Sequence, residues 1–317
     1  MSHDSTGAAG IDVAKDKLDL AIHGQTMRLT VANDAAGWQR LTGALRAARV
    51  GCVGMEASGG YERGVAARLR REGFAVRLLQ PLQTKAFARL RLRRAKNDTV
   101  DAALIAACTA LLDAPETTHD ARLLACADQL TFIEQAEEDI TRLKTRPEHV
   151  AEPRLRRFFL RDIARLTARV RAELKRLAAS LSQSDALARR LELVQGVPGI
   201  GLRTALAIVV RLPELGRVSR EEAAALAGLA PFDNDSGTHH GARRIAGGRA
   251  RLRRSLYAAA LPAAFRWNPA LKALYERLIA RGKTHKAALV ACARKLPVYA
   301  NTVVQRGTPW EPDAQQS

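Results

Sequence analysis

The segment GIDVAKDKLDLAIHG, residues 10–24, decides how the first part of this 317-residue chain folds. Two apolar runs, GIDVAK and LDLAIHG, flank a short polar turn around Lys15 to Lys17, and this pattern predicts two paired strands. The run MRLTVAN, residues 27–33, follows after a few residues and predicts a third strand of the same meander.

Beyond this meander the pattern alternates between helix and strand. Asn33 and Asp34 can cap a helix, and GCVGMEA at residues 51–57 predicts a short apolar strand. YERGVAARLRREG predicts a helix that ends at Gly73, and FAVRLLQP predicts a strand that ends at Pro81. Three meandering strands followed by helix, strand, helix and strand predict an α/β sheet with mixed strand directions.

The middle of the chain predicts long helices. One helix is expected from Asp98 to Leu112, and a long helical region follows in which Pro147 and Pro153 should break the helix. Its second arm has an apolar seam at alternating spacings of four and three, which predicts either a coiled-coil-like hairpin or a helix packed on its own domain. The seam consists of Phe159, Ile163, Leu166, Val170, Leu174, Leu177 and Leu181.

Glycine-rich turns separate the helices of the last third. GVPGIG, residues 196–201, resembles a helix-hairpin-helix turn whose amides can hold a DNA phosphate, although a plain tight turn would read the same way. An Arg-rich helix containing RARLRRSLYAAA follows later. Three aromatic residues, Tyr257, Trp267 and Tyr275, fall at helical spacing among apolar neighbours, which predicts core packing.

These patterns divide the chain into four parts. We expect an α/β domain at residues 1–112 and a helical coiled-coil region at 113–188. A mostly helical domain at 189–305 and a disordered tail at 306–317 complete the predicted organisation.

Positive charge is concentrated in two segments. The chain has 51 Lys and Arg against 32 Asp and Glu, a net charge of +19, and the Arg usage of a GC-rich genome could explain part of this excess. However, residues 77–96 contain seven basic residues and no acid, and residues 236–254 contain six and no acid, while residues 113–185 are balanced. This distribution favours a nucleic acid as the partner.

Several protein classes are excluded. No apolar run is long enough to cross a bilayer, and the N-terminal segment MSHDSTGAAG lacks the features of a secretion signal, so we expect a cytoplasmic protein. The four cysteines are far apart and show no zinc-ligand or disulfide spacing, which predicts small buried side chains: Cys52, Cys108, Cys126 and Cys292.

Four carboxylates occupy positions suited to metal binding. Asp12 and Glu56 lie at the ends of predicted strands, and Asp98 and Asp101 lie three residues apart in the first turn of a predicted helix. Clustered carboxylates need a neutralising cation, and their oxygens suit Mg²⁺ or Mn²⁺. Helix capping alone could explain Asp98 and, less well, Asp101.

The loop DSGTHHG, residues 235–241, allows several interpretations. Asp235, Ser236 and His239 or His240 have the residue types of a hydrolytic triad, but neighbours in one short loop cannot easily take up triad geometry. Two adjacent histidines without further ligands make a poor metal site. From the local residues alone, a polar loop without chemistry is the default interpretation.

Several motifs together resemble one family. GIDVAKDKLDL, GMEASGGYE and KNDTVDA resemble a RuvC-like, ribonuclease H-type domain with an Asp-Glu-Asp-Asp set. Together with GVPGIG, GLAPFDNDSG, GGRARLRRSLYAAA and GKTHKAALVACARKL, they resemble the DEDD transposases of the "one-ten" family of insertion sequences. The resemblance extends from about residue 10 to about residue 304.

The resemblance implies a chemistry and a set of partners. It implies that Asp12, Glu56, Asp98 and Asp101 bind Mg²⁺ (or Mn²⁺), and that Ser236 attacks a DNA phosphodiester to form a covalent phosphoserine link before strand exchange. It further implies donor and target DNA, a structured noncoding guide (bridge) RNA, a dimer to tetramer with composite active sites, and a bacterial, nucleoid-associated location. For His239 and His240 we expect at most a contact with phosphate or RNA.

Glycines and basic residues near these motifs are the expected nucleic-acid contacts. They are Arg89, Arg91, Arg93, Arg94, Lys96, Gly199, Gly201, Arg243, Arg244, Arg249 and Arg253. Two alternatives to a recombinase remain at this point. One is a metal-dependent junction nuclease without a covalent intermediate, and the other is a catalytically silent nucleic-acid-binding protein.

Overall fold

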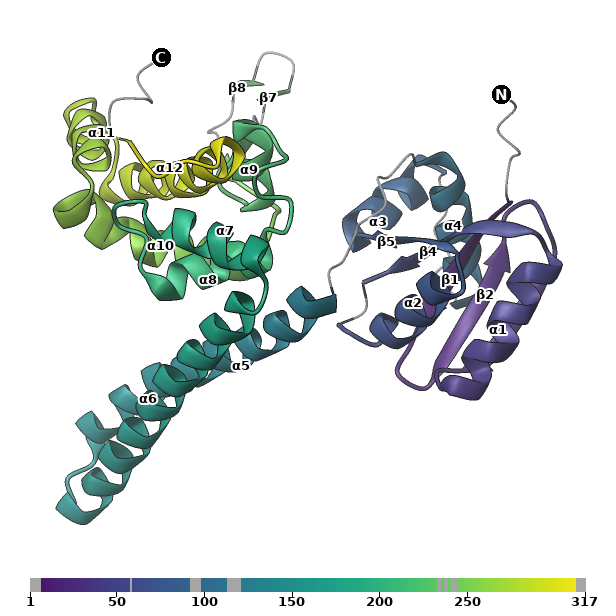
Figure 1. The fold of residues 1–317 in the computed structure, drawn as a ribbon, viewed down its shortest axis with the longest axis horizontal. Helices are drawn as coiled ribbons and strands as arrows, with labels where there is room; N and C mark the ends of the chain where they lie inside the picture. The colour runs from purple at the N-terminus through teal and green to yellow at the C-terminus, as the bar shows by residue number, and fades with distance from the viewer. Residues whose placement is uncertain are drawn as a thin grey trace. The chain divides into compact units, whose positions relative to one another are not determined.

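The structure is a computed structural model that describes residues 7–57, 59–91, 98–112, 121–232, 235–236, 239–240 and 244–311. The chain divides into two compact units, Met1–Thr118 and His119–Ser317 (Figure 1). The predicted boundary between a coiled-coil region and a third domain at residue 188 lies inside the second unit.

A five-stranded mixed sheet forms the first unit, in the order β3-β2-β1-β4-β5. The strands are β1 (Gly7–Val13), β2 (Lys17–Ile22), β3 (Arg28–Ala32), β4 (Val50–Glu56) and β5 (Ala75–Leu79). The first three pair antiparallel, whereas β1 with β4 and β4 with β5 pair parallel. The mixed sheet predicted from the sequence is therefore confirmed.

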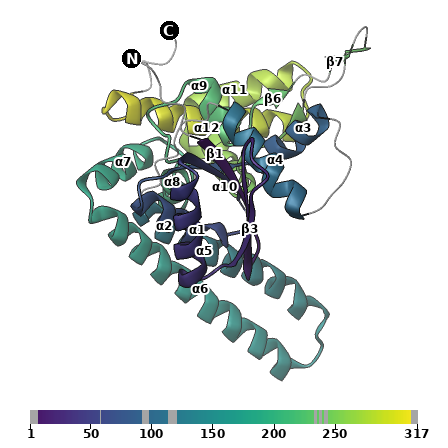
Figure 2. The same ribbon diagram turned by 90° about the vertical axis from the view of Figure 1, so that its right-hand side faces the viewer.

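Helices cover both faces of this sheet (Figures 1 and 2). They are α1 (Ala35–Ala47), α2 (Glu62–Arg71), α3 (Pro81–Leu90) and α4 (Asp98–Leu111). The side chains of α1 and α2 join the core formed by Ile11 and Met55, and α4 packs on the opposite face. Helix α3 was not predicted, because Pro81 was interpreted only as the end of a strand, whereas proline also suits the first position of a helix.

A long helical hairpin begins the second unit. Helix α5 (Ala121–Thr145) and helix α6 (Pro153–Ser182) flank the short helix η1 (Arg146–His149), and they lie side by side in both views (Figures 1 and 2). The predicted breaks at the two prolines are confirmed, and the structure favours the hairpin interpretation of the apolar seam. Val170, Leu177 and Leu181 of that seam are buried in a core shared with α5.

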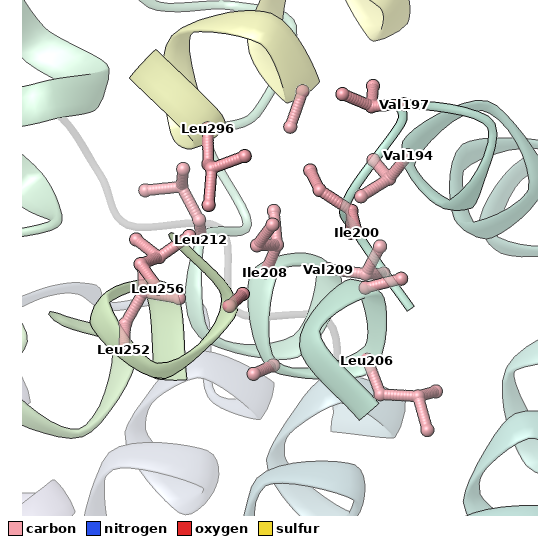
Figure 3. Packing of buried hydrophobic residues seen from close by; sticks show 14 of the residues in the cluster. Val194, Val197, Ile200, Leu206, Ile208, Val209, Leu212, Leu252, Leu256 and Leu296 are labelled. Carbon is pink, nitrogen blue, oxygen red and sulfur yellow. The ribbon is translucent and has the colours of Figure 1, made fainter. Parts of the chain in front are cut away.

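The rest of the second unit is a helical bundle around α8. Its helices are α7 (Asp185–Gln195), α8 (Leu202–Arg211), α9 (Arg220–Leu226), α10 (Ala250–Pro262), the π-helix η2 (Ala263–Trp267), α11 (Pro269–Ala280) and α12 (His285–Arg306). Every residue of α8 from Thr204 to Val210 is buried. Ile208 and Val209 lie among side chains such as Leu256 of α10 and Leu296 of α12 (Figure 3).

Two details of the C-terminal part differ from expectation. Trp267 is 57% exposed instead of buried. The chain leaves α10 through a π-helical turn in which Asn268 N donates to Ala263 O. This turn changes the direction in which the following side chains point, so the helical spacing assumed from the sequence does not continue to Trp267. The predicted tail is packed in its described part, since α12 continues to Arg306 and the ring of Trp310 lies 4.4 Å from that of Tyr299, centroid to centroid.

Burial of the cysteines largely agrees with expectation. Cys108, Cys126 and Cys292 are buried, whereas Cys52 is half-buried. Burial raises the pKa of the Cys292 thiol to about 11. Among the described residues, none of the helices has the length and apolarity needed to span a membrane.

A buried carboxylate ties the hairpin to the bundle. Glu134 of α5 is 5% exposed and accepts two hydrogen bonds from Arg211 of α8, at 3.1 and 2.6 Å, and one from Arg251 of α10 at 3.0 Å. Arg203 of α8 approaches the same carboxylate at 4.0 Å and pairs with Glu137 at 2.6 Å. These contacts join three helices that are far apart in the sequence.

We predict that Glu134→Ala destabilises the second unit by roughly 2–4 kcal/mol, because it leaves the half-buried guanidinium groups of Arg211 and Arg251 without their carboxylate. Glu138→Ala, on the same helix, is the matched control: its partner Arg254 is 68% exposed, so the loss should stay below about 1 kcal/mol. Urea unfolding of both variants measures the difference. Equal losses would contradict the structural role of Glu134.

Candidate functional site

Asp12 and Glu56 lie at matching positions on neighbouring parallel strands. The β1–β4 register pairs Gly10 with Gly54 and Ile11 with Met55, and the next residues along each strand are Asp12 and Glu56. Because neighbouring strands are about 4.8 Å apart, the two carboxylates start from adjacent backbone positions.

Both acids face α4. A Cβ atom at Gly10 would overlap the backbone of Ala102 and Ala106, and one at Gly54 would overlap the side chain of Thr109, so these glycines let α4 lie close against the sheet. Side chains two residues apart on a strand share a face. Asp12 and Glu56 therefore project on the side of the sheet that α4 covers.

The α4 residues of the acidic set lie in its first turns. Asp98 begins the helix, but its side chain lies outside the described residues, and Asp101 is half-buried. On the other side of the site, Thr84 of α3 is buried and donates a hydrogen bond to Glu56 Oε1. Nearby, the pKa of the Cys108 thiol is raised by burial and, secondarily, by the charge of Glu56.

These acids do not form a finished metal site among the described side chains. No group of three Asp, Glu, His or Cys residues in that part of the chain is arranged to hold a metal ion. The structure thus brings Asp12 and Glu56 to adjacent strand ends and places the start of α4 on the same face. No third carboxylate among the described residues joins Asp12 and Glu56 in an arrangement that could hold a metal ion.

Sequence reasoning missed Asp19. The β1–β2 register pairs Asp12 directly with Asp19, so both lie on the α4 face of the sheet. Asp19 accepts a hydrogen bond from Thr30 at 2.5 Å and forms an ion pair with Lys17 at 3.1 Å. The predicted turn at Lys15 to Lys17 is centred on Asp16 and would place Asp12 opposite Leu20. In the structure the hairpin is centred between Lys15 and Asp16, since Ala14 N donates to Lys17 O, and this register places Asp19 opposite Asp12.

Ser236 lies on a segment of paired short strands. Strand β6 (Pro231–Phe232) pairs with β9 (Arg244–Ile245), and β7 (Asp235–Ser236) pairs with β8 (His239–His240), both antiparallel. We call residues 231–245 the serine arm. Its backbone places Ser236 opposite His239, while the side chains of both residues lie outside the described part.

The base of the serine arm is held by close backbone packing. Gly228 and Gly248 both have positive φ, at 70° and 62°, and a Cβ at Gly248 would overlap the backbone of Gly228. Arg253 of α10 donates hydrogen bonds to Gly228 O at 3.3 Å and to Gly247 O at 2.6 Å. These contacts fix where the serine arm leaves the bundle.

The predicted nucleic-acid contacts fall into three groups. Arg249 pairs with Glu214 through two hydrogen bonds, at 2.8 and 2.6 Å, so Arg249 and Arg253 both have partners within the protein. Arg89, Arg91 and Arg244 are exposed. Outside the described residues lie Arg93, Arg94, Lys96 and Arg243.

The two turn glycines position α8. Gly199 has a φ of 92° and packs against Ala263, and Gly201 is the N-cap residue of α8. The first amides of a helix have no acceptor inside the helix, so this turn can present donors to a phosphate.

Sequence comparisons connect this chain to transposases. Residues 9–159 match a transposase family model of the DEDD type from IS110 elements, and residues 191–276 match the model of the transposase IS116/IS110/IS902 family. Over 315 residues the chain is 25% identical to a pilin gene-inverting protein of Moraxella bovis, which covers 95% of this chain and 97% of that protein. Over 117 residues it is 35% identical to the insertion element IS110 uncharacterized 43.6 kDa protein of Streptomyces coelicolor, which covers 36% of this chain and 29% of that protein.

We predict that Gly248→Ala destabilises the base of the serine arm more than Gly247→Ala does. Both glycines have positive φ, so each substitution should cost about 1 kcal/mol or more in backbone strain. Only position 248 adds steric overlap, worth a further 1–3 kcal/mol or so, because a Cβ at 247 meets open space. Urea unfolding and limited proteolysis within residues 229–249 report the difference, and equal behaviour of the two variants would refute the close packing.

Proposed function

Because this chain belongs to the IS110 family of transposases, we propose that it cuts and rejoins DNA with Ser236 as the nucleophile and the acidic residues of a RuvC-like first unit as metal ligands. The two family models together span most of the chain, and members of this family rearrange DNA. The similarity to a protein named for gene inversion, across 95% of the chain, supports strand exchange between two DNA sites.

The observation that carries the proposal is the division of the candidate chemistry between two compact units. Asp12 and Glu56 lie in the first unit, and Ser236 lies on an arm of the second. In a mechanism that uses both the acidic residues and Ser236, a first unit and a second unit meet on the DNA. These two units can come from different copies of the chain. We therefore propose an oligomer, a dimer to tetramer, with composite active sites.

The donor set fits a hard divalent cation. Asp12 and Glu56 offer carboxylate oxygens from adjacent strand ends on one face, and the α4 turn with Asp98 and Asp101 belongs to that face. We propose Mg²⁺, with Mn²⁺ as a substitute. When bound, such an ion neutralises the charge that develops on a phosphodiester during displacement. Thr84 would hold the Glu56 carboxylate in orientation through its hydrogen bond.

The reaction of Ser236 is a transesterification. The Ser236 hydroxyl oxygen bonds to phosphorus and loses its proton, while the bond from phosphorus to the leaving DNA oxygen breaks and that oxygen takes up a proton. Rejoining reverses these changes when a DNA hydroxyl attacks the phosphoserine. Since one phosphodiester is exchanged for another, the bond energy needed for resealing is conserved. Strand exchange through a Holliday-junction-like intermediate fits between the two steps.

Guidance by a structured noncoding (bridge) RNA belongs to the same proposal. Exposed cations outside the acidic face offer a surface for its phosphates. On α3 these include Lys85 and Arg89, and along α6 they include Arg154, Arg157, Arg161, Arg169 and Arg171. His239 and His240 would contact phosphate or RNA next to the nucleophile.

We expect Ser236→Ala to abolish any covalent protein–DNA adduct, because alanine lacks the attacking oxygen. The assay incubates full-length protein with labelled DNA that carries the junction of the element, together with its guide RNA and Mg²⁺, and resolves adducts on a denaturing gel. Ser180→Ala, on the exposed surface of α6, is the control and should form adducts normally. If Ser236→Ala still cuts the DNA, the protein is a metal-dependent nuclease that uses water.

Asp12→Asn and Glu56→Gln should each lower strand cutting at least about 100-fold while leaving DNA binding nearly intact, because they remove ligand charge but keep side-chain volume. Glu72→Gln is the control, since Glu72 pairs with Arg46 and Arg68 on the surface. Cutting is measured across a Mg²⁺ titration and binding by gel shift. Unchanged cutting in both acid variants would remove the metal from the proposal.

A further inference from the structure

A cavity of 530 Å³ lies beside the GVPGIG turn, within the second unit. Its walls come from the turn, from the first turn of α8 and from the end of α10, and they include Val197, Ile200, Thr204, Pro262 and Trp267. Among the residues that the structure describes, no charged side chain lines it. Its volume falls in the range of small-ligand sites, and its walls are mostly apolar with polar backbone at one edge.

Trp267 is fixed in place at the edge of this cavity. The next residue, Asn268, is 3% exposed, donates to Pro198 O at 3.0 Å and accepts from Leu271 N at 3.1 Å. Ala263, at the start of the same π-helix, packs against Gly199. The indole is therefore presented at a fixed position relative to the turn, although 57% of the residue is exposed.

A cation accompanies the exposed ring. The guanidinium carbon of Arg266 lies 5.2 Å from the centroid of the Trp267 ring, and Phe265 is also 50% exposed. Phe265 and Trp267 belong to the same π-helix and are both exposed, and adjoining exposed apolar side chains can mark a binding surface. An aromatic face, an adjacent arginine and a turn that leads into a helix N-terminus together match the chemistry of one unpaired nucleotide: a base that stacks and a phosphate that needs donors.

We propose that this cavity binds an unpaired nucleotide of a single DNA strand, with the base stacked on Trp267 and the phosphate held near Arg266 and the first turn of α8. DNA is the occupant because the family acts on DNA, and strand exchange separates the two strands. The absence of acidic groups from the walls and the net charge of +19 favour a polyanion over a basic peptide. The inference rests on the proposed function only for the expectation that strands separate, and binding at this cavity does not require Ser236.

Equilibrium binding to labelled oligonucleotides tests the proposal. With the full-length protein, Trp267→Ala should weaken binding of a single-stranded oligo-dT about 10-fold, since stacking on one aromatic residue contributes roughly 1–3 kcal/mol. Trp267→Phe should restore most of the affinity. An abasic strand of the same length and charge should bind the wild type and Trp267→Ala equally, and duplex DNA should show no dependence on Trp267.

Two controls separate this site from general aromatic or charge effects. Phe132 on α5 is also an exposed aromatic, at 44%, and is not among the residues assigned above to nucleic-acid binding, so Phe132→Ala should leave oligo-dT binding unchanged. Stacking should also quench tryptophan fluorescence in the wild type but not in Trp267→Phe. Equal binding of oligo-dT by the wild type and Trp267→Ala would overturn the proposal, as would an equal loss on the abasic strand. Tighter Trp267-dependent binding of oligo-U RNA would overturn the choice of DNA.

Because these measurements detect binding without cutting, they also apply to Ser236→Ala. If Ser236→Ala binds oligo-dT with the same dependence on Trp267 but forms no adduct, both proposals stand. If the wild type forms adducts normally and Trp267→Ala binds oligo-dT as tightly as the wild type does, only the cavity proposal fails.

Discussion

The buried carboxylate of Glu134 is the constraint on which the architecture of the second unit depends. A single carboxylate with three guanidinium groups around it, at 2.6–4.0 Å, can be stable away from water only if its partners stay in place. Helix α10 carries one of these partners, Arg251. Its N-cap residue Arg249 binds Glu214, and Arg253 in its first turn binds the carbonyl oxygens of Gly228 and Gly247. The hairpin and the base of the serine arm are thus both fixed by arginines of α10.

This arrangement changes the interpretation of the Arg-rich segment. A run of arginines without acids suggested nucleic-acid contacts, yet the acids that Arg249 and Arg251 bind lie 35 and 117 residues away in the sequence. Charge counts along a chain cannot detect partners at such separations. Within this segment Arg244 and Arg254 stay exposed. Further exposed cations lie on α3 and along α6, where the side chains have no comparable buried partner among the contacts described above.

Local patterns predicted the elements whose signals are local. Alternating apolar residues gave the three-stranded meander, and prolines gave the breaks of the hairpin, because each depends on neighbours in the sequence. Asp12 and Glu56 were predicted as site residues from the same kind of local signal. Their common orientation depends on Gly10 and Gly54, which let α4 lie against the sheet in a contact between distant segments. Trp267 was placed in the core because a helical spacing was assumed to continue through a π-helical turn.

The position of Ser236 has a consequence for the proposed chemistry. Ser236 is four positions after Phe232 of β6, so its Cα can lie at most roughly 14 Å from that of Phe232 on the serine arm. The anchored elements at that base supply glycines, arginines that are already paired, and the Glu214 carboxylate, which is bound to Arg249 through two hydrogen bonds. In the proposed reaction a serine hydroxyl is too weak a nucleophile without a metal or a base, so it stays inactive until the acidic face of a first unit reaches it. Building the nucleophile and its activating acids on separate units would therefore link DNA cleavage to assembly of the complex on DNA.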